Sequence, residues 1–127
     1  MISKKKKKVE LIAIKEVTRE YTERGFSVTS VESENLGWDL EAVNNKTKLK
    51  IEVKGLSGNT ISITLTPNEL QNMNKHKESY RLGVVINCLN NPILHLFAYS
   101  FEKNEWLNED GKTLIIDQII SARCYIQ

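Results

Sequence analysis

Cysteine and proline are scarce in this sequence, with two of each among 127 residues. Cys88 and Cys124 form no CxxC pair, and His76 and His95 stand apart, so the spacing of a structural zinc site is missing. Cys88 lies in an apolar run, where it is expected to be a small buried residue. A cytoplasmic protein without a disulfide is the simplest interpretation.

Long apolar runs and a strong excess of one charge are also absent. No stretch approaches the roughly 20 apolar residues of a membrane span, and no apolar region or cleavage site follows the basic N-terminus as in a secretory signal. The 18 basic and 16 acidic residues give a net charge of +2, which alone does not indicate nucleic-acid binding. The length suits one domain over residues 1–127.

Five consecutive lysines, Lys4 to Lys8, are the strongest local concentration of charge. Like charges repel, so a solvated tail is one interpretation, and a flexible arm that contacts phosphate groups is the other. The positive end of a helix dipole disfavours cations. We therefore expect residues 1–8 to form a basic, flexible segment that lies mostly outside the first helix.

Hydrophobic periodicity and turn residues divide the rest of the chain into helices and strands. The motif Thr66-Pro67-Asn68-Glu69 has the form of a capping box with proline at the first helical position. Residues 100–112 are loop-like, and residues 113–127 are apolar and of β type. The pattern predicts helices over residues 9–24 and 67–77, and strands over residues 26–31, 38–43, 49–54, 60–65, 81–88 and 93–99. This order predicts an α/β (α+β) fold with a mixed sheet flanked by helices.

Two neighbouring strands carry the residues of most chemical interest. Alternation puts Glu52 and Lys54 on one face of their strand, and a hairpin would bring Asp39 of the preceding strand to the same face. Two carboxylates from adjacent strands suit Mg²⁺, and a nearby lysine can orient water or stabilise charge on a phosphate. The alternative is an amphipathic strand with a solvated polar face, which explains the same alternation of apolar and charged residues without a functional site.

Glu10 is a fourth candidate. It precedes Ala13, Ile14 and Val17 by three, four and seven residues, which places it on the apolar stripe of the first helix. A buried carboxylate needs a cation or a metal as its partner. The alternative is that Glu10 lies half exposed near the start of the helix.

The motifs GWDL (residues 37–40), EVKG (residues 52–55) and LTPNE (residues 65–69) occur in an order that is specific in combination. In this respect residues 9–99 resemble the C-terminal domain family of the protein NO VEIN, a branch of the PD-(D/E)xK nuclease superfamily. The resemblance implies a restriction-endonuclease-like core, with a mixed sheet between helices.

The resemblance also implies a site. It makes Asp39, Glu52 and Lys54 the catalytic residues, with Glu10 as the first-helix carboxylate, and Asp39, Glu52 and Val53 as metal ligands. The implied activity is Mg²⁺-dependent hydrolysis of phosphodiester bonds in DNA, with Mn²⁺ able to substitute, in a prokaryotic restriction or defence context. The alternative is a module that keeps the fold and binds nucleic acid or a protein partner without cleavage. Expected partners are DNA and either a second copy of the chain or a larger protein.

Overall fold

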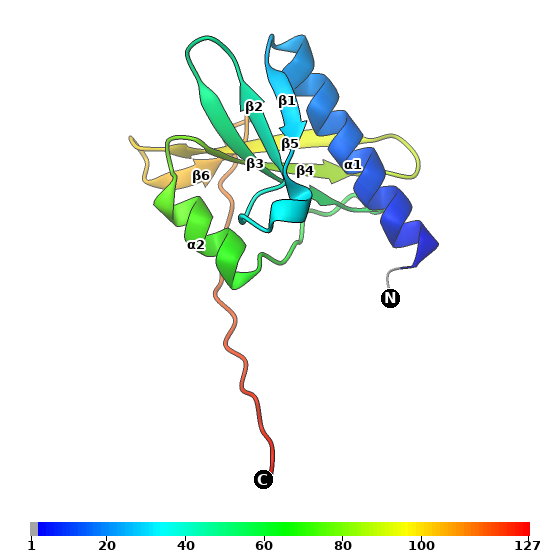
Figure 1. The fold of residues 1–127 in the computed structure, drawn as a ribbon, viewed down its shortest axis with the longest axis vertical. Coiled ribbons are helices and arrows are strands. Elements are labelled where there is room, and N and C mark those ends of the chain that lie inside the picture. The colour runs from blue at the N-terminus through cyan, green and yellow to red at the C-terminus, as the bar shows by residue number, and fades with distance from the viewer. Residues whose placement is uncertain (1–2) are drawn as a thin grey trace.

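The structure is a computed structural model and describes residues 3–127. Within that range two α-helices and a six-stranded sheet form the body of the molecule, from which the C-terminal residues extend (Figure 1). The elements are α1 (Lys4–Glu23), β1 (Ser27–Ser30), a 3₁₀ turn η1 (Glu32–Glu34), β2 (Leu40–Val43), β3 (Lys48–Gly55), α2 (Pro67–Lys75), β4 (Tyr80–Ile86), β5 (Ile93–Ser100) and β6 (Glu105–Leu107). The prediction of a mixed sheet flanked by helices is confirmed.

The strands lie in the sheet in their sequence order, β1 to β6. All neighbours are antiparallel except β3 and β4, which are parallel and are joined by the crossover that contains α2. The β2–β3 hairpin pairs Leu40 with Ile51, and the parallel pair sets Lys54 beside Val84. The predicted hairpin between these two strands is therefore confirmed.

Helix α1 covers one face of the sheet with a narrow apolar stripe. Its buried residues recur every four positions, which places them on one side of the helix. They pack against side chains that β2 to β5 project toward the helix, and together they form the larger hydrophobic core. The helical residues are Val9, Ala13, Val17 and Tyr21.

The opposite face of β4 and β5 is covered differently. Leu82, Val84, Ile86 and Phe97 form a second cluster, and irregular chain rather than a helix packs over it. The covering side chains come from the β3–α2 connection and from the start of the C-terminal segment: Leu56, Ile61, Ile63, Leu65 and Leu114. A third cluster, beside the second, joins α2 to Tyr80 and Trp106 through Met73.

The lysine run forms the first turns of α1, so the prediction that it lies outside the helix is wrong. The helix begins at Lys4, and the Ser3 hydroxyl caps it by accepting a hydrogen bond from the Lys6 backbone N–H at 3.1 Å. All five lysines are exposed, so their ammonium groups stay in water, and lysine is a good helix former. Met1 and Ile2 of the predicted flexible segment lie outside the described residues.

The strand predicted over residues 60–65 is also wrong. These residues are extended and their side chains alternate between half-buried and exposed, but they belong to no strand of the sheet. Their apolar side chains pack on the second cluster, and this holds the segment across the face of the sheet instead of at its edge. Strand β6 was missed because it lies in a polar stretch. Trp106 is the one buried residue of the strand, and it packs against Tyr80 and Tyr99.

Both cysteines are free, and Cys88 is buried as predicted. Its thiol contacts the Val85 carbonyl oxygen at 3.3 Å. In residues 3–127 no helix has both the length and the apolar character that crossing a membrane requires.

Gly55 marks the point where α1 comes closest to the end of β3. A β-carbon at Gly55 would lie 2.9 Å from both the Ala13 Cβ and the Val9 carbonyl oxygen. We expect Gly55→Ala to push α1 from the sheet and lower the free energy of unfolding by about 1–3 kcal/mol. Chemical denaturation measures this. Gly58→Ala is the matched control, because nothing lies within 4 Å of its added β-carbon, and an equal loss in both variants would contradict the close approach.

Candidate active site

Asp39 and Glu52 face each other across the hairpin of β2 and β3. Asp39 immediately precedes β2, and its N–H donates to the Ile51 carbonyl at 2.9 Å, which extends the pairing by one residue. The Asp39 side chain then accepts a hydrogen bond from the Val53 N–H at 2.8 Å through Oδ2. The carboxylate is thus fixed against the second half of β3, on the face that strand alternation predicted.

Glu52 is a buried acid, with 3% of its surface exposed. Burial raises its pKa to about 9, and the nearby negative charges of Asp39 and Glu69 add to this effect. Burial also raises the pKa of Asp39, although the hydrogen bond from Val53 opposes that shift. Without a cation between them, the two acids therefore hold a proton at neutral pH.

Lys54 lies next to Glu52 on the same face of β3. Its Nζ is 2.9 Å from Glu69 Oε1 and 3.5 Å from Glu52 Oε2, and its side chain is mostly buried. Burial lowers the pKa of Lys54, but the hydrogen bond to Glu69 and the charges of both glutamates outweigh this, and the net shift is upward. The ammonium group is therefore charged throughout the physiological pH range.

Glu69 performs two tasks. As predicted, it completes the capping box of α2: its side chain accepts from the Thr66 N–H at 2.9 Å, while the Thr66 hydroxyl accepts from the Glu69 N–H at 3.1 Å. The same Oε1 binds Lys54. Burial raises the pKa of Glu69, but Lys54 and the Thr66 N–H outweigh it and the net shift is downward. The sequence predicted the cap and missed the ion pair, which requires α2 to begin over β3.

Tyr80 supports the turn before Asp39. It is fully buried, and its hydroxyl donates to the Gly37 carbonyl at 2.7 Å. Burial raises the pKa of this phenol, and the charges of Glu52, Glu69 and Asp39 raise it further. Tyr80 therefore stays neutral and holds the GWDL turn in place. No signal in the sequence indicated this role.

Glu10 does not lie on the buried stripe of α1, so that part of the prediction is wrong. The residue before it, Val9, is buried, and Glu10 itself is exposed to solvent. The buried positions recur every four residues from Val9, and Glu10 is turned about 100° from them on a helix of 3.6 residues per turn. Its catalytic role stays a prediction.

The residues present fit a magnesium ion. In residues 3–127 no three carboxylate, histidine or cysteine side chains are grouped so as to hold a metal ion. Mg²⁺, however, needs one or two carboxylates and keeps several waters. Asp39 and Glu52 supply two carboxylates whose mutual repulsion a cation would relieve, and strand alternation turns the Val53 carbonyl toward the side of β2 where Asp39 lies. These three residues would hold the ion.

The fold and this cluster define a mixed α/β domain with an acidic pair and a lysine on one face of its sheet. The sequence profile of the family described as "Protein NO VEIN, C-terminal" matches residues 9–99. The match covers more than half of the chain, so this protein belongs to that family, as the motifs predicted. No curated protein and no solved structure matches the chain.

Proposed function

We propose that this protein is a metal-dependent nuclease that hydrolyses phosphodiester bonds, most readily in DNA. The observation that carries the proposal is the buried Glu52, which faces Asp39 across β2 and β3 with the Lys54 ammonium group 3.5 Å away. A protein without use for this acid could replace it with an apolar residue at little cost in stability, because buried ionisable groups seldom stabilise a fold. Strongly shifted acids of this kind cluster at functional sites.

Each residue has a role that its surroundings define. A bound Mg²⁺ would activate water and neutralise charge on the phosphate. Asp39, held by the Val53 N–H, and Glu52 would orient that ion. Lys54 keeps its proton at neutral pH, so we assign it the stabilisation of negative charge on the scissile phosphate rather than the role of general base.

The lysine-bearing turns of α1 support a polyanionic substrate. Lys4 to Lys8 immediately precede Val9, whose carbonyl oxygen and side chain adjoin Gly55, the residue after Lys54. The helical turns that carry these exposed lysines therefore begin near the C-terminal end of β3, on the face of the sheet opposite to Glu52 and Lys54. Lysines that contact phosphates make binding strongly dependent on salt concentration. The restriction or defence context remains a proposal that rests on the family resemblance.

A second candidate function is a binding module that does not cleave. It is favoured by one observation: Lys54 is paired with both Glu69 and Glu52, and Glu69 also caps α2, so the cluster has a structural use. Such a module would bind nucleic acid or a protein partner and would need no metal.

The test is incubation of the full chain with plasmid, single-stranded DNA and RNA in Mg²⁺, in Mn²⁺ and in a chelator. The nuclease proposal expects cleavage that requires the metal, with DNA cut faster than RNA. Binding of these substrates without cleavage under any condition would support the second function and oppose the first.

A further inference from the structure

Residues 60–65 have every property of a β-strand except a partner. Their side chains alternate, with Ile61, Ile63 and Leu65 turned toward the second cluster and the residues between them exposed. None of their backbone groups forms a backbone–backbone hydrogen bond with the described part of the chain. A row of free N–H and C=O groups on an extended segment is a template for an added strand.

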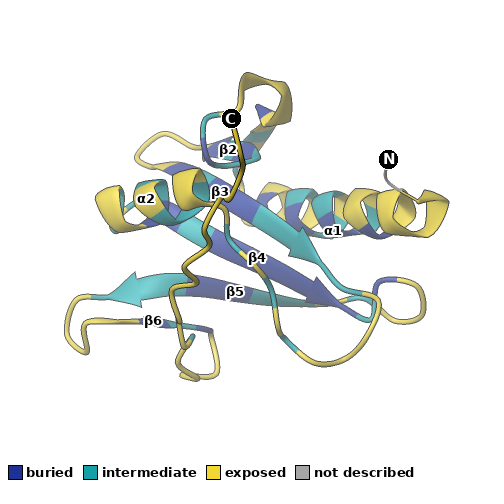
Figure 2. Cartoon of the chain, turned by 90° about the horizontal axis from the view of Figure 1, so that it is seen from below, coloured by how far each residue is buried: buried dark blue, intermediate teal, exposed yellow. Residues whose placement is uncertain are grey.

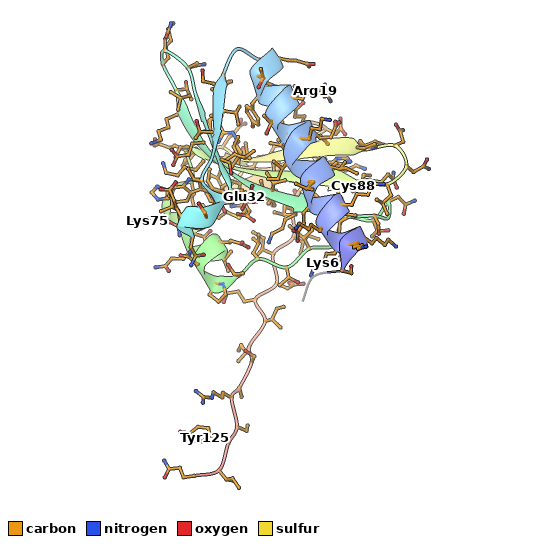
Figure 3. All side chains as sticks on the ribbon, turned by 45° about the vertical axis from the view of Figure 1, so that its right-hand side comes forward. Lys6, Arg19, Glu32, Lys75, Cys88 and Tyr125 are labelled. Carbon is orange, nitrogen blue, oxygen red and sulfur yellow. The ribbon has the colours of Figure 1, made fainter. Side chains whose placement is uncertain are left out.

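The C-terminal arm, residues 115–127, is rich in apolar side chains and forms no backbone–backbone hydrogen bond with residues 3–114. It extends away from the body of the molecule, and Tyr125 stands clear of it near the tip (Figures 1 and 3). Six large apolar side chains of the arm are exposed, Ile120 and Ile126 to 95% and 97%. Large apolar side chains that are exposed together mark sites of interaction with another protein or surface. The exposed residues are Ile115, Ile116, Ile119, Ile120, Tyr125 and Ile126.

The arm and residues 60–65 adjoin the same hollow. The arm begins after Leu114, which packs against the same clusters as Leu65. The Leu114 N–H donates to the Trp106 carbonyl at 2.8 Å. The start of the arm then forms one wall of a hollow, and residues 63–67 with the exposed side of α2 form the other. Figure 2 shows the arm in yellow as it leaves the sheet. An apolar strand that entered this hollow would meet free backbone groups on one wall and isoleucines on the other.

We propose that the occupant of this hollow is the C-terminal arm of a second copy of the chain. Each arm would pair with residues 60–65 of the other molecule, and the exchange would close as a two-fold symmetric dimer. The arm supplies what the hollow needs: β-type apolar side chains, an unpaired backbone, and a reach beyond its own body. This proposal is independent of the nuclease function.

The exchange would also brace the candidate active site. Residues 60–65 run directly into Thr66, which caps α2 together with Glu69, and Glu69 holds Lys54. An added strand would thereby restrain the connection that positions Lys54.

Sedimentation equilibrium of the full chain tests the exchange. A concentration-dependent dimer is expected, and Ile119→Asp should weaken it by at least about tenfold, because one buried isoleucine changes an equilibrium constant by roughly that factor or more. Leu11→Asp is the matched control, since Leu11 is a similarly exposed aliphatic residue on α1, and it should leave the dimer intact. A monomer at all concentrations, or a dimer equally weakened by both substitutions, would overturn the proposal.

Thiol cross-linking separates exchange between molecules from folding back within one. In a Cys124→Ser background, chains with Thr64→Cys are mixed with chains that carry Gln118→Cys and treated with a short bismaleimide. Exchange predicts a cross-linked heterodimer. If a chain with both substitutions cross-links only within itself, as a monomer, the arm covers its own hollow. If a dimer forms without the heterodimeric cross-link, the interface lies elsewhere. Either result refutes the proposal.

Discussion

Replacing Lys54 with alanine should lower the rate of metal-dependent DNA cleavage by roughly 100- to 1,000-fold, the usual cost of losing one positioned donor to a developing negative charge. The Lys54 ammonium group is the cation held among Glu52 and Glu69 on the face that carries Asp39. Its removal takes positive charge from the site and leaves both glutamates unpaired. Initial rates on plasmid DNA at saturating Mg²⁺ measure the effect.

Lys50→Ala is the control for this loss. Lys50 lies on the same strand, four residues before Lys54, and its ammonium group stacks over the Trp38 ring at 5.5 Å instead of joining the acidic cluster. It should keep cleavage within a few-fold of the wild type. Both variants must be shown to be folded by circular dichroism. Equal losses from the two substitutions would mean that cleavage depends on positive charge along β3 in general and not on Lys54.

Replacing Glu52 with glutamine should remove a large part of the dependence of stability on pH. The folded pKa of Glu52 is about 9, against a reference value of 4.5 in the unfolded chain. Between these values the folded state binds more protons, so rising pH favours the unfolded chain. The wild type should therefore be at full stability below about pH 4.5 with respect to this group and lose stability progressively up to about pH 9.

Glutamine resembles the protonated acid, so the variant should match the wild type near pH 5 and exceed it near pH 9. Urea denaturation of both proteins from pH 5 to 9, in a chelator, gives the difference directly. Subtracting the two curves cancels the titrating groups that lie away from Glu52. Asp39 and Glu69 interact with Glu52, so the difference reports the loss of Glu52 together with its effect on these two acids. Parallel curves would show that Glu52 is not protonated in the folded protein.

Strand alternation was sufficient to predict how Asp39, Glu52 and Lys54 are placed. The three residues lie close in sequence, and a single hairpin brings them together, so local patterning carries the information. Glu69 illustrates the limit of this reasoning. Its capping role follows from the residues beside it, whereas its contact with Lys54, 15 positions earlier, depends on where the crossover sets α2 over the sheet.

The predictions for residues 60–65 and for the lysine run were wrong for two different reasons. Alternation of apolar and polar side chains in residues 60–65 indicates a segment with one buried and one exposed face. Irregular chain that packs on an apolar cluster has this pattern as much as a paired strand does. The unfavourable interaction of Lys4 to Lys8 with the helix dipole is weak at an exposed helix end. The Ser3 cap and the helix propensity of lysine outweighed it.

Calorimetric titration of Mn²⁺ or Mg²⁺ into the full chain at pH 7, in buffers of different ionisation enthalpy, tests the central claim most directly. The ion should displace the proton that Asp39 and Glu52 share, so binding should release about one proton per site. Glu52→Gln, which has no such proton, should bind far more weakly and release none. Metal binding that is unchanged in Glu52→Gln, or no binding by the wild type, would contradict a cation site between these two acids.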